Sequence, residues 1–180
     1  MKFLKKLFFG ILILIGLALI IALFTKKDYA IEREIVINKP SGEVFNYIKY
    51  VKNQDNFSVW NQRDTAMKKD YKGEDGTVGF VYAWDSEKKE VGKGEQEIKK
   101  ITEGQRVDFE LRFKEPMEAT DTAYMTTTPV SDASTKVKWG FSGRMPYPFN
   151  LMLVFMDMDK MIGGDLQSGL NNLKTKMETK

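Results

Sequence analysis

The hydrophobic and polar positions divide the chain into an apolar N-terminal segment and a longer region of short periodic stretches. Residues 7–24, LFFGILILIGLALIIALF, contain no charged side chain, and lysines lie on both sides of them. As a helix rising about 1.5 Å per residue, this run reaches about 27 Å, close to the thickness of the hydrocarbon core of a bilayer. The pattern predicts a transmembrane anchor over residues 1–27 and one folded domain over residues 28–180.

A cleaved signal peptide is the alternative interpretation of the N-terminal segment, because MKFLKK is a positively charged start. The apolar run is longer than the usual signal core of roughly 7–15 residues, and no pair of small residues precedes a cleavage point near LFTKKDYA. We therefore favour an uncleaved, single-pass membrane anchor. Slightly more positive charge lies before the run than after it, which predicts an extracytoplasmic domain.

The start of the domain predicts a strand, two short helices and then a series of strands. Residues 31–37 alternate in period two, with isoleucines on one face. After Pro40, SGEVFNYIKYV carries apolar residues at helical spacing, and a second short helix is expected before Trp60. From residue 66 to residue 145, turn signals such as KGEDG and PVSDAST separate about six further strands.

Three of these predicted strands carry large apolar side chains on one face only. The polar residues between them mark the opposite face as exposed, so the sheet must bury its apolar face against another element. The apolar positions are Phe80, Tyr82 and Trp84 in GFVYAWD, Val107, Phe109, Leu111 and Phe113 in VDFELRF, and Val137, Trp139 and Phe141 in VKWGFSG.

The C-terminal segment from residue 149 is the long apolar element that remains to cover this sheet. Charged side chains within two turns of its apolar start exclude a second membrane span. Gly163 and Gly164 each lower helix stability by about 1 kcal/mol relative to Ala, so they indicate a close approach to the sheet or a bend over a cavity. Apolar residues at intervals of three or four predict one continuous amphipathic helix, with Leu151, Phe155, Met158, Ile162, Leu166, Leu170, Leu173 and Met177 on one face.

Composition excludes several classes of function. The chain contains no Cys and no His, which rules out disulfides, thiolate nucleophiles, triads that need His, and ordinary zinc sites. Five lysines and no acidic residue lie in residues 1–27, so residues 28–180 hold 23 basic against 25 acidic residues, a formal charge of −2. Nucleic-acid binding is not expected, because it requires clustered Lys and Arg.

The order of these elements and five stretches of sequence resemble the START-like superfamily, also called SRPBCC, and within it the polyketide cyclase/dehydrase-like proteins. The resemblance covers roughly residues 29–178. It implies an α+β helix-grip fold, in which a curved antiparallel sheet wraps around a long C-terminal helix, here preceded by one transmembrane helix. The stretches are INKPSGEVFNYI, FSVW, YKGEDGTVGFVYAWDSEKKEVGKGEQEI, FKEPMEAT and MDMDKMIGGDLQSGLNNLK.

The resemblance also implies a cavity between the sheet and the helix that accepts lipids, sterols or aromatic polyketides. Aromatic side chains there can stack on a ligand, and Met can adapt to varied apolar shapes, although the same residues also suit an ordinary packed core. No catalytic constellation, cofactor or metal site is predicted. The residues expected to line the cavity are Trp60, Tyr82, Trp84, Phe109, Trp139, Phe141, Phe155, Met158 and Ile162.

Three functional hypotheses follow from the sequence. The first is a membrane-anchored module that binds a small hydrophobic molecule, such as a lipid, isoprenoid or polyketide-like compound, and needs no catalytic residue. The second is a cyclase-like or hydrolase-like enzyme, which requires an ionisable group with a shifted pKa inside the apolar cavity. The third is a ligand-free interaction domain of the cell envelope, in which the core is filled. The volume and the lining of the cavity distinguish these hypotheses.

Overall fold

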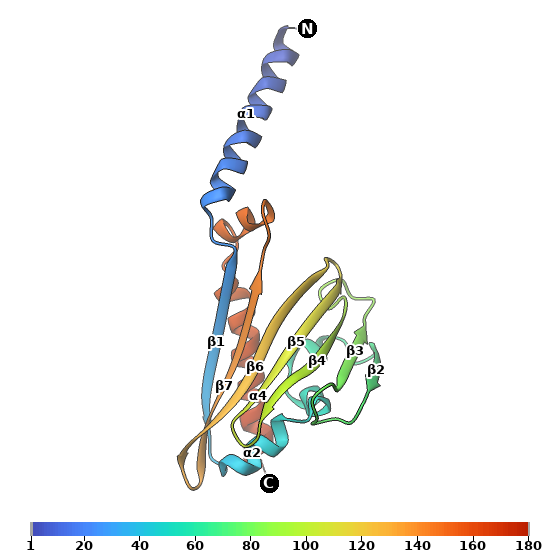
Figure 1. Ribbon diagram of the computed structural model, residues 1–180, viewed down its shortest axis with the longest axis vertical. Coiled ribbons are helices and arrows are strands. Elements are labelled where there is room, and N and C mark those ends of the chain that lie inside the picture. Colours follow the sequence, from blue (N-terminus) through green and yellow to red (C-terminus); the bar gives the residue numbers. More distant parts are fainter. Residues whose placement is uncertain (1, 180) are drawn as a thin grey trace.

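The computed structural model describes residues 2–179 and has a seven-stranded antiparallel sheet with one long helix packed on its inner face (Figure 1). The strand order is β1-β7-β6-β5-β4-β3-β2. The predicted α+β helix-grip fold is thereby confirmed. The elements are α1 (Lys2–Phe24), β1 (Asp28–Ile37), α2 (Ser41–Ile48), η1 (Val51–Asn56), α3 (Val59–Arg63), β2 (Lys68–Lys72), β3 (Val81–Asp85), β4 (Lys93–Thr102), β5 (Arg106–Glu115), β6 (Ala119–Ser131), β7 (Ser134–Arg144), η2 (Phe149–Val154) and α4 (Met158–Glu178).

The alternation of apolar and polar residues determines which face of the sheet is buried. In β1, Ile31 and Ile37 are buried, whereas Val36 points outward and is exposed. In β5, Phe109 lies opposite Ile98 of β4 and Ala123 of β6, and these residues belong to the same buried layer. The apolar faces predicted for the strands near residues 80–84, 107–113 and 137–141 are the inner face of the sheet.

The C-terminal segment is interrupted, which corrects the prediction of one continuous helix from residue 151. Residues 149–154 form the short 3-10 helix η2, and α4 begins only at Met158. Asp157 is the N-cap of α4, and its side chain accepts a hydrogen bond of 3.1 Å from the backbone N–H of Lys160. A carboxylate at this position satisfies a free N–H of the first turn, so α4 starts there and η2 remains a separate element.

Two glycines of α4 lie where the helix comes closest to the sheet. A Cβ at Gly169 would lie 2.7 Å from the ring of Trp139 on β7, and a Cβ at Gly163 would overlap the guanidinium group of Arg33 on β1. The close approach predicted for Gly163 is therefore present. At Gly164, by contrast, no described atom beyond the neighbouring residues and the local helix backbone lies within 4 Å of the position that a Cβ would take.

The N-terminal helix α1 is long and apolar enough to cross a membrane, and its side chains are almost all exposed (Figure 1). A signal sequence near an N-terminus has the same length and composition. The chain therefore has one candidate membrane span within residues 2–179. The division into an anchor over residues 1–27 and a domain over residues 28–180 stays a prediction.

The two glycine environments on α4 predict opposite effects of the same substitution. Gly169→Ala forces the helix away from Trp139, whose ring is held by Phe57 and Trp60, and is expected to lower the free energy of unfolding by about 1–3 kcal/mol. Gly164→Ala, the matched control, is expected to raise it by about 0.5–1 kcal/mol. Urea unfolding of the full chain in a mild detergent measures both, and equal effects would contradict the account of helix packing.

Candidate ligand cavity

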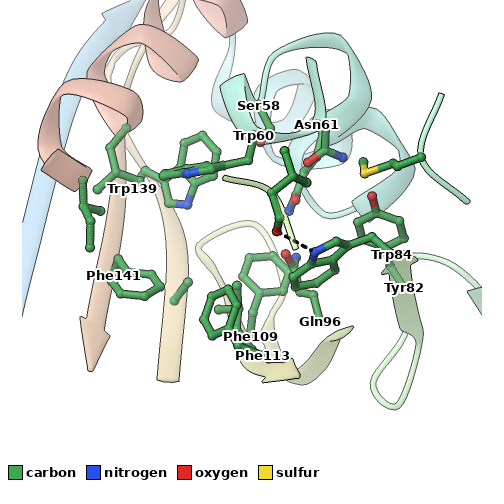
Figure 2. A pocket seen from close by; sticks show the side chains of 17 residues that line it. Ser58, Trp60, Asn61, Tyr82, Trp84, Gln96, Phe109, Phe113, Trp139 and Phe141 are labelled. Carbon is green, nitrogen blue, oxygen red and sulfur yellow. Dashed lines mark hydrogen bonds between the residues drawn. The ribbon is translucent and has the colours of Figure 1, made fainter. Parts of the chain in front are cut away.

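A cavity of about 190 Å³ lies between the inner face of the sheet and the helices α3 and α4 (Figure 2). Strands β3 to β7 supply one wall, and the first two turns of α4 and the region around α3 supply the other. Seven of the nine residues predicted for the site line this cavity. They are Trp60, Tyr82, Trp84, Phe109, Trp139, Phe141 and Ile162.

The cavity exists because α4 covers only one side of the sheet closely. Strands β1 and β7 lie together at one edge, and α4 packs along both of them. The other edge, formed by β2 and β3, lies across the width of the sheet from β1. Large aromatic side chains fill much of the intervening space, but the partly open volume that remains is larger than a water molecule needs.

Aromatic rings pack against one another along the cavity wall. The ring of Trp139 lies 6.0 Å from that of Trp60 and contacts it edge to face. Farther along the sheet, on β3 and β5, Tyr82 lies 5.8 Å from Trp84, and Trp84 lies 5.9 Å from Phe113. Edge-to-face and tilted contacts of this kind hold aromatic rings in fixed orientations. The cavity is therefore bounded by rings that support one another.

Two of the predicted site residues, Phe155 and Met158, do not line the cavity. Phe155 lies between η2 and α4, and 82% of it is exposed. Met158 begins α4 and is partly buried against the edge of the core. The sequence pattern places both in the cavity wall only if one helix continues from residue 151, whereas α4 begins after the Asp157 N-cap.

The prediction from sequence missed ten lining residues. The sequence pattern predicts the correct faces for Leu111, Phe113 and Leu166 but does not assign these residues to the site. The polar residues among the ten were missed because polar side chains in strands and short helices suggest an exposed surface. The ten are Gln54, Ser58, Asn61, Met67, Val91, Gln96, Leu111, Phe113, Ala123 and Leu166.

Two polar groups in the cavity wall are buried and have no hydrogen-bond partner among the described residues. They are the hydroxyl of Tyr82 and Nε2 of Gln96, which lie directly opposite each other on β3 and β4. Burial raises the pKa of the Tyr82 hydroxyl far above its usual value, so this group is a neutral donor or acceptor. By contrast, Nε1 of Trp84 already donates to the carbonyl oxygen of Val91 at 3.4 Å (Figure 2).

The charged groups of the central strands lie on the outer face, as predicted. Arg112 donates to Glu95 at 2.6 Å and to Glu97 at 2.7 Å, and it also contacts Glu110. These hydrogen bonds lower the pKa of Glu95 and of Glu97. Within residues 2–179, no side chain that lines the cavity is charged. The cavity can bind an apolar molecule and hydrogen-bond to it, but its lining supplies no carboxylate or amine for proton transfer.

One carboxyl group points to the inner face of the sheet but lies outside the cavity. Asp121 of β6 is 6% exposed, and the hydroxyl of Tyr29 donates to its Oδ2 at 3.4 Å. Burial raises the pKa of Asp121 and that of Tyr29. Asp121 belongs to a separate, shallow groove of about 460 Å³ at the ends of β1 and β7, next to the ion pair between Asp28 and Arg144.

The raised pKa of Asp121 predicts a pH-dependent effect of its replacement. If the pKa of a carboxyl is higher in the folded state than in the unfolded state, the free energy of unfolding of the protein falls as the pH rises through the folded-state pKa. Asp121→Asn removes this loss, so it is expected to raise the free energy of unfolding at about pH 7 and to give little gain at about pH 3.5, where the carboxyl is mostly protonated in both states. Urea unfolding at both pH values measures this. An equal gain at both would contradict the assignment.

Comparison with known proteins matches the chain over residues 29–178 to the family described as polyketide cyclase/dehydrase and lipid transport. No curated protein matches significantly. Among solved structures, truncated norcoclaurine synthase from Thalictrum flavum has a TM-score of 0.63 at 11% identity, covering 85% of this chain and 96% of that one.

Two further solved structures share the fold. A structural-genomics protein from Nitrosospira multiformis has a TM-score of 0.58 at 17% identity, covering 84% of this chain and 97% of that one. The Aha1 dimer from Colwellia psychrerythraea has a TM-score of 0.56 at 14% identity, covering 83% of this chain and 96% of that one. At such identities these similarities show a common fold.

Proposed function

Because the chain belongs to the polyketide cyclase/dehydrase and lipid-transport family, we propose that it binds a compact hydrophobic molecule in the cavity between the sheet and α4. The observation that carries this proposal is a partly open cavity of about 190 Å³ whose lining is mainly apolar and rich in aromatic rings. Interiors of proteins are normally close-packed, so an apolar space of this size favours a ligand over the filled core of a purely structural domain.

The volume limits the size of the ligand. An apolar cavity of about 150 Å³ holds a benzene molecule, whereas sites for drug-sized ligands measure roughly 300–1,000 Å³. The cavity of about 190 Å³ therefore suits a single substituted ring, a short branched chain such as an isoprenoid unit, or the end of a longer lipid. Apolar contact alone stabilises such a complex by about 0.8 kcal/mol for each methylene buried.

The two unpaired polar groups indicate that the ligand carries an oxygen. Nε2 of Gln96 can only donate a hydrogen bond, and the hydroxyl of Tyr82 can donate or accept one. A pure hydrocarbon would leave both groups buried without a partner, at a cost of about 1–3 kcal/mol for each. A carbonyl or hydroxyl oxygen on the ligand satisfies them, which favours ketones, alcohols and esters.

We further propose that α1 is retained as a single-pass membrane anchor and that the domain is extracytoplasmic. The uncharged run of residues 7–24 supports the anchor, and the distribution of lysines on its two sides supports the orientation. The enzymatic alternative has less support, because the described lining of the cavity holds no charged side chain.

Ligand binding can be followed with the tryptophans that the protein already contains. The chain has three, and all of them line the cavity. Menthone, a compact cyclic ketone, is expected to change their emission saturably. Ala123→Leu fills the cavity and should weaken this binding at least tenfold. Thr122→Leu, its neighbour on the outer face of β6, should leave it unchanged. Unchanged binding by Ala123→Leu would place the ligand elsewhere.

The role of the polar groups predicts a change in ligand preference. Replacing Gln96 with Leu should weaken the binding of menthone by about tenfold, corresponding to about 1.4 kcal/mol, and should not weaken the binding of p-menthane, which has the same ring without the oxygen. Tyr82→Phe is expected to act in the same direction. The ligand-free Gln96→Leu variant should also be more stable in urea. Equal losses for both ligands would argue against recognition of an oxygen.

A further inference from the structure

An unusual concentration of exposed apolar side chains surrounds η2. Outside α1, eleven large apolar residues in the described chain are well exposed, and six of them lie between residues 147 and 161. The other five are scattered singly, which is normal for a protein surface. A cluster of this kind marks a site of interaction. We define the η2 surface as Tyr147, Phe149, Met152, Val154, Phe155 and Met161.

The η2 surface is joined to the end of α1 by a buried polar contact. The side chain of Asn150 is fully buried, and its Nδ2 donates to the carbonyl oxygens of Ala22 at 2.7 Å and of Thr25 at 2.9 Å. Ala22 belongs to the last turn of α1, whose carbonyls have no partner within the helix, and Thr25 directly follows that turn. Ala22 itself is completely buried. Figure 1 shows η2 beside the base of α1.

This contact sets the depth of η2 relative to a membrane that α1 crosses. Ala22 lies two residues before the end of the uncharged run, or roughly 3 Å inside it at 1.5 Å per residue. The whole run is about 27 Å long, no longer than the hydrocarbon core of about 30 Å. The bilayer therefore has to extend to the level of Ala22, and with it to the level of η2.

We propose that the η2 surface inserts into the boundary of the same bilayer, beside α1. This inference rests on the proposed role of α1 as a membrane anchor. The occupant is lipid rather than protein, because the η2 surface continues the exposed apolar surface of α1. Interfacial helices bury their apolar faces at the boundary between headgroups and acyl chains, and the contact through Asn150 places η2 at that boundary, roughly 3 Å inside the end of the uncharged run. Lys26 and Lys27 follow α1 at the level of the headgroups.

Insertion of the η2 surface brings the cavity close to the membrane. Ile162 lines the cavity and directly follows Met161 of the η2 surface. On the sheet, Phe141 lines the cavity and lies opposite Ile31 of β1. Strand β1 begins only four residues after α1 ends. On this inference, the ligand reaches the cavity from the membrane rather than from solution. It is therefore a molecule that partitions into the bilayer.

The absence of Cys from the chain allows a direct test with single labels. Phe155→Cys in the full chain, labelled with the fluorophore NBD and reconstituted into phosphatidylcholine–phosphatidylglycerol vesicles, reports the environment of the η2 surface. Its emission should be blue-shifted and quenched by lipids that carry a nitroxide near the headgroup. Val130→Cys is the control, because Val130 is also apolar and well exposed but lies in the β6–β7 hairpin, at the other end of the sheet.

We expect the nitroxide lipids to quench the label at residue 155 at least threefold more strongly than the label at residue 130. Equal quenching would overturn the inference. A blue shift at residue 155 without quenching by lipid would also overturn it, since the surface would then be covered by protein, such as a second copy of the chain. Phe149→Asp combined with Val154→Asp should reduce the quenching of a label at residue 161, which excludes an effect of the label itself.

Two further readouts separate failure of this inference from failure of the proposed function. A label introduced by Leu14→Cys in the middle of α1 should be quenched by lipids with a nitroxide deep in the acyl chain. If it is quenched and residue 155 is not, the anchor stands and the inference about η2 is wrong. If the label at residue 14 is not quenched, the anchor is wrong. Menthone binding in detergent tests the cavity independently of both.

Discussion

The close contact of α4 with β1 and β7 determines the arrangement of the rest of the domain. Because Gly163 and Gly169 have no side chain, the guanidinium of Arg33 on β1 and the ring of Trp139 on β7 pack against the backbone of α4. The helix therefore lies directly on these two strands. The ion pair of Arg33 with Asp159, at 2.7 Å, holds the start of the helix at the same place. A single helix placed at one side of a wide sheet cannot fill the space over the other side, and the cavity is the consequence.

The chemistry of the cavity follows from which residues the strands turn inward. Strand alternation places the charged side chains around Arg112 on the outer face and leaves aromatic rings on the inner face. Tyr82 and Gln96 are polar exceptions on that inner face, and their buried groups are costly unless a ligand contacts them. A lining of this composition favours binding of a compact, oxygen-bearing apolar molecule over acid–base catalysis.

Most of the fold could be predicted from sequence, and seven of the nine residues predicted for the site lie in the cavity wall, because side chains alternate strictly in strands. That periodicity placed Tyr82, Trp84, Trp139 and Phe141 on one face before their neighbours in space were known. The start of α4 was not predictable from periodicity, since the N-cap at Asp157 competes with the apolar pattern on both sides of it.

Contacts between residues far apart in the chain could not be found in the same way. Gln96 occupies an inward position of β4, but a polar residue in a strand suggests an exposed face. The hydrogen bonds from Asn150 to the carbonyl oxygens of Ala22 and Thr25, at and just after the end of α1, join residues more than a hundred positions apart. Gln and Asn are common surface residues, and only burial in the fold distinguishes Gln96 and Asn150 from the Gln and Asn residues on the surface of the chain. These two side chains nevertheless determine the polarity of the cavity and the position of η2.

Native mass spectrometry of the full chain, extracted gently from membranes, tests the central claim most directly. Our account predicts one small, oxygen-containing hydrophobic molecule bound to each chain, which organic solvent releases for identification. Its mass should be that of a single ring system or a short isoprenoid, or of a lipid with one end in the cavity. A bare chain, with no stoichiometric small molecule in the extract and no uptake of added apolar ligands, would contradict the claim.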